Sequence, residues 1–462
     1  MSDTVIAIVG GGISGLSAAY ELNRRGVPFV LLEKSARVGG LVRTERIDGF
    51  TIDTGPDSLL IQKPAAIELC AELGLTNKLV STLPPRTAYV VRKGTLRPLP
   101  SASVFGIPTS ATPLLTGKLL STSGKLRMSL DLIIPPRRHK SDESVANFFR
   151  RRFGKESVDY LAEPLLAGIH AGDVEALSMH ALFPRLVDAE KTHGSVIRAF
   201  HKLLSKAGDN RARYGLFRSF ADGLYALVEG IISVLPPTAV QCDTEVVGLS
   251  GTGPFVLNCS GRPPINARQV IFAVPAYRAA DLLHPIDRKI GSLCSMISYT
   301  STATVVLAYP RSVVRHPLLG TGFVVPKTEP NTMITAATWI SSKWPQRAPD
   351  DHILLRGFVG GARSPGALKQ SDQTLMAGVQ RDFSRLLMID GEPSLARIYR
   401  WQNANPQPNV GHLEHVAAID YALASVPDLH IIGAAFRGVG IPDCVAAGRS
   451  AGANAEMRYS SR

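Results

Sequence analysis

The segment at residues 5–34 (VIAIVGGGISGLSAAYELNRRGVPFVLLEK) is the feature that most restricts how this chain can fold. Its apolar, β-branched run at 5–9 predicts a buried strand, which leads directly into a GxGxxG motif. In that motif Gly10 permits a tight turn, Gly12 lets a pyrophosphate approach the backbone, and Gly15 lets helix and strand pack closely.

The residues after the glycines complete a strand–helix–strand unit. A helix is expected over 14–25, where its free N–H groups could bind phosphate, and Gly26 ends it. A second strand at 29–32 leads to Glu33, whose carboxylate can accept hydrogen bonds from ribose hydroxyls. Because strand, helix, strand and acid all stand at the expected spacing, the segment predicts a Rossmann-like dinucleotide-binding unit.

The C-terminal stretch at 428–455 repeats part of this pattern. A buried strand is expected at 429–432, followed by a glycine-rich turn and a helix that begins near Pro442 and is rich in small residues. A second helix N-terminus suited to a phosphate or polar ring favours one nucleotide-binding sheet built from both ends of the chain.

The middle of the chain divides into segments with different predicted secondary structure. We expect a β-hairpin at 84–100 around Lys93-Gly94, helical pieces near 116–125 and from 141, and short strands over 240–268 and 269–275. Strand-like runs follow at 299–309, 322–325, 332–339 and 353–359, with an amphipathic helix at 372–387. The predicted fold class is therefore α/β: a discontinuous Rossmann-like domain, a mainly antiparallel α+β substrate domain and an inserted helical domain. The predicted boundaries are 1–84, 205–275 and 405–462 for the nucleotide domain, 85–100 and 276–404 for the substrate domain, and 101–204 for the helical domain.

Residues 163–173 (EPLLAGIHAGD) fit no regular element in this scheme. Pro164 is expected to stop a helix, and Gly168 and Gly172 to break whatever follows. The sequence therefore predicts an irregular apolar loop that carries one histidine.

Charge and cysteine content bear on location and partners. The net charge is +13, and residues 73–130 contain no Asp or Glu but eight Lys or Arg. This excess favours a carboxylate-rich substrate or an anionic membrane surface, and the Pro- and Leu-rich context does not favour nucleic acid. Five scattered cysteines, no apolar run of about twenty residues and no signal-peptide pattern at the start favour a cytoplasmic protein without metal ligands.

Three motifs together resemble one family. The N-terminal "GGGISGL…E…RVGG…GP", the central "RRFGKESVDYLAEPLLAGIHAGDVEALSM" and the terminal "GAAFRGVGIPDC" are similar to the oxygen-dependent, FAD-containing protoporphyrinogen/coproporphyrinogen III oxidases, within the flavin amine-oxidase superfamily. The resemblance spans nearly the whole chain. It implies an oxidoreductase of haem biosynthesis that passes a hydride from a porphyrinogen to a non-covalent FAD and then to dioxygen, releasing hydrogen peroxide.

The resemblance also implies site residues, with no catalytic side chain and no metal. Those expected to bind FAD are Gly10, Gly11, Gly12, Ile13, Ser14, Gly15, Glu33, Lys34, Gly40, Leu41, Gly55, Pro56, Asp57, Ser58, Val246, Ala434, Val439, Gly440 and Ile441. Those expected to bind substrate are Arg86, Gly168, Ile169, His170, Ala171, Gly172 and Thr321. Arg86 matches the family's carboxylate-binding arginine. The family usually has Tyr at the position of His170, so an ordinary packed histidine is the favoured interpretation there, and the role of Asp57 stays open.

Three alternatives remain open. A flavin amine oxidase would place a lysine where this chain has Thr304, and a carotenoid-type desaturase lacks the central motif. A non-catalytic flavin-binding subunit at the membrane is the third. The preferred porphyrinogen, the choice between monomer and homodimer, and peripheral contact with the inner face of the membrane through the basic helical region are also left open.

Overall fold

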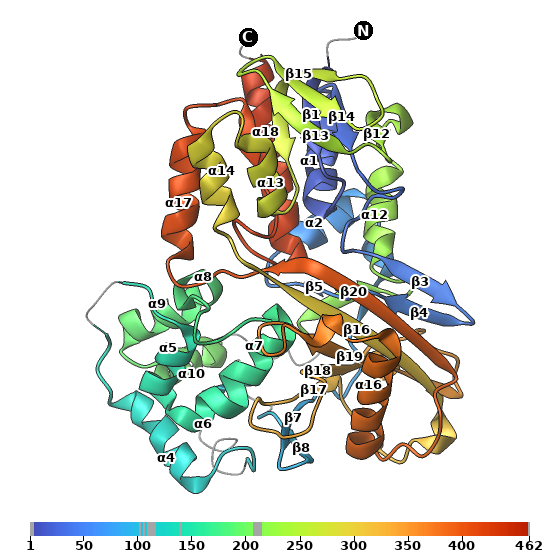
Figure 1. The fold of residues 1–462 in the computed structure, drawn as a ribbon. Coiled ribbons are helices and arrows are strands. Elements are labelled where there is room, and N and C mark those ends of the chain that lie inside the picture. The colour runs from blue at the N-terminus through green and yellow to red at the C-terminus, as the bar shows by residue number, and fades with distance from the viewer. Residues whose placement is uncertain are drawn as a thin grey trace.

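The computed structural model describes residues 4–100, 103–104, 107–108, 117–137, 141–206 and 215–460. Two large sheets organise these residues, one in the half that carries both termini and one in the opposite half, with a group of helices beside the second (Figure 1). The predicted α/β class is confirmed. Within the described residues, no helix combines the length and the apolar character needed to cross a membrane.

The first sheet is built from both ends and the middle of the chain. In order it contains β12 (Val240–Gln241), β2 (Phe29–Leu32), β1 (Thr4–Val9), β15 (Ile265–Phe272), β14 (Phe255–Cys259) and β13 (Val246–Ser250), and β21 (Leu429–Ile431) also pairs with β15. The pairs β12–β2, β2–β1, β1–β15 and β15–β21 are parallel. The expectation that the sheet is discontinuous in sequence is therefore confirmed.

Helices cover both faces of this sheet because the strand residues alternate in direction. Ile6 and Ile8 of β1 join the core beneath α1 (Ile13–Arg24) and α18 (Ile441–Ser460), whereas Ala7 and Val9 join the opposite core. The first core also contains residues of α2 (Ala65–Glu72) and α12 (Tyr225–Ile232). The second contains residues of α13 (Ala276–Leu283), α14 (Arg288–Ser295) and α17 (His412–Leu423).

The second sheet is almost entirely antiparallel, as predicted. Its order is β20 (Leu395–Pro406), β16 (Tyr299–Pro310), β19 (His352–Gly360), β18 (Ala336–Trp339), β17 (Gly322–Val324), β7 (Ala88–Arg92) and β8 (Thr95–Pro98), and only β17–β7 is parallel. The hairpin at Lys93-Gly94 is confirmed, with both turn residues at positive φ (52° and 70°). The predicted strand at 332–339 is shorter, covering only β18. Helix α16 (Asp372–Leu387) packs on one face.

Short strands form three smaller sheets in the described residues. They are β3 (Thr44–Ile47) and β4 (Phe50–Asp53), a three-stranded sheet of β5 (Leu59–Leu60), β11 (Phe217–Phe220) and β6 (Leu79–Ser81), and the pair β9 (Ser103–Val104) and β10 (Ile107–Pro108). Single turns of helix occur at α15 (Ile340–Lys343), η1 (Thr76–Lys78), η2 (Leu130–Leu132), η4 (Pro237–Ala239), η5 (Arg311–Val313) and η6 (Ala367–Lys369).

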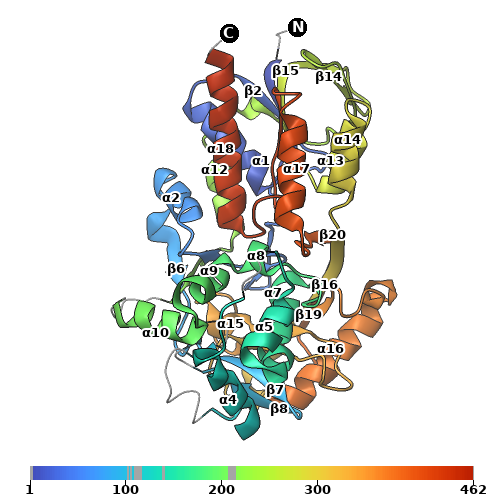
Figure 2. The same cartoon turned by 90° about the vertical axis from the view of Figure 1, so that its left-hand side faces the viewer.

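The helical insertion lies beside the second sheet, below α17 and α18 in the side view of Figure 2. It comprises α4 (Thr122–Ser129), α5 (Val145–Phe153), α6 (Lys155–Ser157), the π-helical turn η3 (Val158–Ala162), α7 (Glu163–His170), α8 (Met179–Leu182), α9 (Pro184–His193) and α10 (Val196–Lys206). Ser144 caps α5 by accepting a hydrogen bond from the Asn147 N–H (3.1 Å). The helix expected near 116–125 lies slightly later, at α4, and most of 101–116 falls outside the described residues.

The prediction of an irregular loop at 163–173 is wrong. Residues 163–170 form α7, which continues directly from η3, and Pro164 lies in its first turn, where a missing N–H is tolerated. The helix ends at Ala171, which adopts a left-handed conformation (φ 52°). Only the last part of the segment is therefore non-helical.

Candidate functional site

The first glycine turn connects β1 to α1 and leaves one position open. Gly10 has φ +105°, and a Cβ there would lie 2.6 Å from the carbonyl oxygen of Ala273. A Cβ at Gly15 would collide with the Gly10 carbonyl, so this glycine lets the helix approach the strand. A Cβ at Gly12, in contrast, would meet no atom within 4 Å. Protein atoms therefore leave the space beside Gly12 open.

That space lies at the N-terminus of α1. Gly12 is the N-cap residue, and no side chain caps the first turn, which begins with Ile13 and Ser14. The first N–H groups of a helix point out of its end and favour a negative charge. The open space and the uncapped helix end fit the diphosphate of a dinucleotide.

Glu33 follows β2 at the same edge of the sheet. Its Oε2 accepts a hydrogen bond from the Gly11 N–H (2.7 Å) and its Oε1 from the Ser35 N–H (2.9 Å). Its backbone carbonyl accepts from Thr244 N–H (2.8 Å), two residues before Val246 at the start of β13. The carboxylate is held rigidly beside the glycine turn, and each oxygen keeps a further lone pair for a ribose hydroxyl.

The loop after Glu33 folds back onto the glycine turn. Gly39 N–H donates to Gly11 C=O (2.7 Å), and a Cβ on Gly40 would lie 3.1 Å from Gly12 Cα. Lys34 and Leu41 on this loop are exposed, Leu41 with 41% of its surface. The structure therefore gathers the N-terminal group of predicted cofactor residues at one edge of the sheet.

Helix α18 brings the C-terminal group to the same edge. Gly448 has no room for a side chain because its Cβ would strike the Ser14 carbonyl, so α18 packs directly along α1 (Figure 1). The predicted residues Ala434, Val439, Gly440 and Ile441 occupy the turn from β21 into this helix. Two parallel helices thus begin next to each other at the carboxyl ends of β1 and β21.

The loop 53–58 connects the nucleotide site to the second sheet. The Thr54 carbonyl accepts hydrogen bonds from Trp401 Nε1 (2.9 Å) and Thr304 Oγ1 (3.1 Å). Arg356 donates to the carbonyls of Asp53 and Gly55 (2.9 Å each). Strands β16, β19 and β20 therefore all hold this loop, and Pro56, Asp57 and Ser58 are positioned by residues far away in sequence.

Asp57 is the centre of a buried charge cluster. Its carboxylate lies 2.9 Å from Lys343 Nζ and 2.8 Å from an Arg356 guanidinium nitrogen, and the three side chains are 11%, 14% and 3% exposed. Burial alone would raise the pKa of Asp57, but the two cations outweigh it and hold that pKa well below its usual value. Burial lowers the pKa of Lys343, an effect that the neighbouring carboxylate opposes.

The sequence did not single out Lys343, Arg356 or Trp401. A signal existed for Arg356, because it interrupts the apolar strand run ILLRGFV, and a charge inside a buried strand requires a partner. Thr304, proposed to stand where amine oxidases have a lysine, is buried and is used to hold the Thr54 carbonyl.

The end of α7 approaches the second sheet and the nucleotide half together. A Cβ on Gly168 would lie 3.1 Å from Ala336 Cβ, and one on Gly172 would lie 2.5 Å from Gln407 Oε1. Protein atoms fill the space beside both glycines, so their small size serves packing, and contact with substrate stays a prediction. Ile169 between them is 61% exposed.

His170 ends this helix with a half-buried ring. Its carbonyl accepts from Gln407 Nε2 (3.1 Å), but within the described residues its enclosed Nδ1 has no hydrogen-bond partner. Burial, and then the nearby Lys63 ammonium, lowers the pKa of His170 to about 4, so the ring is neutral at physiological pH. The ring is therefore partly enclosed by protein and keeps one unsatisfied nitrogen, and its role stays a prediction.

Arg86 and Thr321 lie close together at the edge of the second sheet. Arg86 Nε donates to the Thr82 carbonyl (3.1 Å) and hydroxyl (2.9 Å). The next residue, Thr87, accepts from the Thr321 N–H (2.9 Å). The structure therefore brings these two predicted substrate residues together, although they are 235 positions apart.

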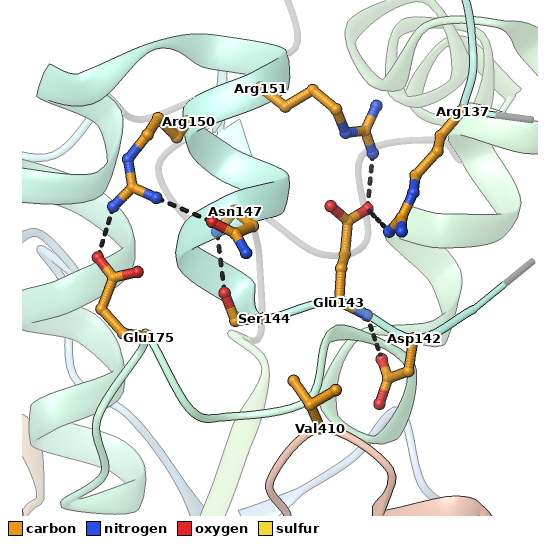
Figure 3. Close-up of a pocket in the computed structure, with 9 residues that line it drawn as sticks. All are labelled: Arg137, Asp142, Glu143, Ser144, Asn147, Arg150, Arg151, Glu175 and Val410. Carbon is orange, nitrogen blue, oxygen red and sulfur yellow. Dashed lines mark hydrogen bonds and ion pairs between the residues drawn. The ribbon is translucent and has the colours of Figure 1, made fainter. Parts of the chain in front are cut away.

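A separate pocket of about 590 Å³ lies on the helical insertion (Figure 3). Its charged groups already pair with one another: Arg150 with Glu175, and Arg151 and Arg137 with Glu143. None of its lining residues belongs to the nucleotide edge or to the Asp57 cluster. Within the described residues, no group of three or more His, Cys, Asp or Glu side chains could hold a metal ion.

Comparisons with known proteins agree with this architecture. The family model described as flavin-containing amine oxidoreductase matches residues 13–455. The chain is 38% identical to coproporphyrinogen III oxidase of Bacillus subtilis (strain 168) over 96% of both proteins, and 30% identical to mitochondrial protoporphyrinogen oxidase of Nicotiana tabacum over 96% of this chain and 93% of that protein. A crystal structure from Exiguobacterium sp. 255-15, provisionally designated protoporphyrinogen oxidase, superposes with a TM-score of 0.87 and 33% identity, covering 99% of this chain and all of that one. The chain belongs to the flavin-containing amine oxidoreductase family.

Proposed function

We propose that this protein is an FAD-dependent oxidase that converts a porphyrinogen to the corresponding porphyrin in haem biosynthesis, with dioxygen as electron acceptor. Protoporphyrinogen IX and coproporphyrinogen III are the candidate substrates. Coproporphyrinogen III is favoured, because three relatives that each match 96% of this chain, at 38%, 32% and 32% identity, carry that substrate in their names.

The main support for the proposal is the length of this chain over which the porphyrinogen oxidases can be aligned. A similarity confined to the glycine turn and α18 would support flavin binding alone, because many flavoproteins share that unit. The relatives named for porphyrinogens instead match 96% of the chain, including the helical insertion and the second sheet. The parts that would form the substrate site are therefore shared as well as the cofactor site.

The residues at the site suit this chemistry. Bound FAD would supply the hydride acceptor. The glycine turn, α18 and Glu33 would hold the dinucleotide, and the loop 53–58, fixed by Arg356, would orient it against the second sheet. Each oxidation removes one hydride from a bridging carbon together with one proton, and over the whole reaction two of the three protons leave pyrrole nitrogens and the third leaves the fourth bridging carbon. Three such rounds remove six electrons and six protons, which three dioxygen molecules take up as three hydrogen peroxide molecules.

Non-covalent attachment of FAD is supported by the state of Cys444, the cysteine at the start of α18. Burial raises the pKa of its thiol to about 11, so it is not a reactive thiolate at neutral pH. The thiol is also 6% exposed.

Parallel oxygen-uptake assays with the two porphyrinogens test the proposal, with a primary amine as the matched control substrate. We expect about three molecules of dioxygen per porphyrin formed, faster turnover of coproporphyrinogen III, and none of the amine. Oxygen uptake with the amine but with neither porphyrinogen would refute the proposal and indicate an amine oxidase.

We further propose that the protein is cytoplasmic. The alternative is a protein that contacts an anionic membrane peripherally through the helical insertion. Leu126 and Ile133 expose 69% and 76% of their surfaces there, close in sequence to Lys125 and Arg127. Lysine or arginine beside an anionic surface contributes about 1 kcal/mol each. Most of the apolar stretch 104–120 lies outside the described residues.

A further inference from the structure

The C-terminal end of α7 is held by a side chain from a distant part of the chain. The last carbonyl groups of an α-helix have no partner within the helix, so they need donors from outside it. At His170, the last residue of α7, the donor is Gln407 Nε2, which lies 3.1 Å from the carbonyl oxygen. Gln407 directly follows β20 and is only 6% exposed. A buried amide that stands 237 positions later therefore caps this helix.

The orientation of the Gln407 amide is fixed by its surroundings. Its nitrogen also donates to Thr300 Oγ1 (3.1 Å) and to the carbonyl oxygens of Asn405 (3.0 Å) and Pro406 (3.4 Å). Turning the amide over would place its oxygen against three carbonyl oxygens, which can only accept hydrogen bonds. The nitrogen therefore faces the end of α7, and one amide joins this helix to both β16 and β20.

The backbone of Gln407 is anchored as well. Its N–H donates to the Ser298 carbonyl (2.9 Å), and its own carbonyl accepts from the Asn409 N–H (2.9 Å). Asn409 in turn pairs with Leu177, in the segment that follows α7, through an isolated antiparallel bridge. Because the connection from β20 to α17 joins the second sheet to the nucleotide half, the end of α7 is fixed relative to both.

The turn beyond the helix end also depends on contacts from outside. Ala171 has φ +52°, a left-handed conformation that is unfavourable for a residue with a side chain. Its carbonyl accepts a hydrogen bond from the Ala362 N–H (2.8 Å), just after β19. The next residue is Gly172, where a Cβ would lie 2.5 Å from Gln407 Oε1. The strained turn is therefore held on two sides, and the glycine leaves room for the amide.

Two side chains of the predicted substrate site stand at this helix end. Ile169 is 61% exposed, and the ring of His170 is half-buried. Groups that contact a reacting substrate must be held accurately, since a displacement of about 1 Å can reduce a rate about a hundredfold. A helix end that lost its cap would carry both side chains away from their positions.

We propose that Gln407 is a positioning residue for the porphyrinogen: by capping α7, it keeps Ile169 and His170 where the macrocycle binds, without touching the macrocycle itself. The inference rests on the proposed porphyrinogen oxidase function and deepens it. It adds a residue that none of the three sequence motifs contains.

Two measurements test this role: the affinity of the holoprotein for the product coproporphyrin III, and the steady-state oxidation of coproporphyrinogen III per bound flavin. Gln407→Met keeps the length of the side chain but has no N–H, and Gln407→Asn keeps an amide that is one carbon too short to reach the His170 carbonyl. Gln380→Met on α16 is the matched control, because that amide donates to the Glu392 carboxylate (2.7 Å) at the surface. Flavin content, melting temperature and hydrogen exchange of peptides covering 163–173 are recorded for every variant.

We expect Gln407→Met to weaken product binding and to raise the KM roughly tenfold, the scale of one or two lost neutral hydrogen bonds, with a further fall in kcat and normal flavin content. Gln407→Asn should change both quantities in the same direction, and it decides the outcome if Gln407→Met does not fold. Exchange should become faster at 163–173 and stay unchanged in α16. A mere loss of stability would lower the amount of folded protein but not the product affinity of the molecules that remain folded.

Product affinity and KM equal to those of Gln380→Met would overturn the inference, even with faster exchange, because the cap would then serve only the helix. Weaker binding with unchanged exchange at 163–173 would overturn it too. Oxygen uptake by the wild type separates the two levels: product binding that depends on Gln407, without turnover of either porphyrinogen, would refute the proposed function and leave the positioning of a porphyrin site standing. A wild type that binds no porphyrin would refute both.

Discussion

Replacing Asp57 with asparagine should destabilise the protein strongly, because the carboxylate lies between two buried cations. The substitution keeps the size of the side chain and one acceptor oxygen, but removes the charge that balances Lys343 and Arg356. Losing one partner of a buried ion pair costs about 3–5 kcal/mol, and since the amide oxygen can still accept one hydrogen bond we expect about 3 kcal/mol. Loosening of the loop 53–58 should weaken FAD retention in the same variant.

Guanidinium denaturation followed by tryptophan fluorescence measures this effect, and Trp344 Nε1 lies 3.4 Å from the Asp57 carboxylate. Asp390→Asn is the matched control. It removes the same charge from a pair with Arg315 that is almost fully exposed, which should cost under about 1 kcal/mol. The double change Asp57→Asn/Lys343→Met should recover much of the loss, because it removes one of the uncompensated cations.

The effect should depend on pH with a defined sign. The native pKa of Asp57 lies below its unfolded value of about 3.9, so the contribution of the carboxylate is complete above about pH 5 and is lost as the pH falls further. The gap between wild type and Asp57→Asn should therefore narrow below pH 4. The native pKa of Lys343 lies below its unfolded value of about 10.4, so stability rises with pH within that window, more steeply once Asp57 is gone. Equal stability of Asp57→Asn and Asp390→Asn at pH 7 would refute this account of the cluster.

Three further predictions concern the cofactor, the substrate and the membrane. Acid precipitation should release all flavin to the supernatant, and a yellow pellet would contradict non-covalent binding. The Gly12→Val variant should purify without flavin, because the valine side chain would occupy the open space beside the glycine turn. A yellow Gly12→Val protein would contradict the proposed position of the cofactor. Arg86→Ala should raise the KM for the free-acid porphyrinogen roughly ten- to a hundredfold, with a smaller fall in kcat and normal flavin content. If the variant keeps the KM of the wild type, Arg86 does not bind substrate. Co-sedimentation with anionic liposomes should fall as salt rises if the helical insertion binds electrostatically, and binding that salt does not change would exclude that mechanism.

The nucleotide half could be predicted closely because its signals are local. Gly10 and Gly15 are required by the backbone at their own positions, and Glu33 ends a strand that its apolar run already indicates. The pairing of the two chain ends followed from finding the strand–glycine–helix pattern twice. Such features can be predicted from the sequence because each depends on residues only a few positions apart.

The Asp57 cluster could not be predicted in the same way. Its members stand at positions 57, 343 and 356, and only the crossing of the loop 53–58 over the second sheet brings them together. Arg356 within an apolar strand indicated that some buried partner exists but not which one.

The segment 163–173 shows why a correct local rule can predict the wrong element. Proline does disfavour a helix interior, yet Pro164 lies in the first turn of α7, directly after a π-helical turn, where a missing N–H is tolerated. The close neighbours of Gly168 and Gly172 are Ala336 and Gln407 of the same protein, and a contact of either glycine with substrate stays a prediction. Close packing of α7 on the second sheet fixes where Ile169 and His170 stand, so enlarging Gly168 or Gly172 should move both residues together, whether or not substrate touches either glycine.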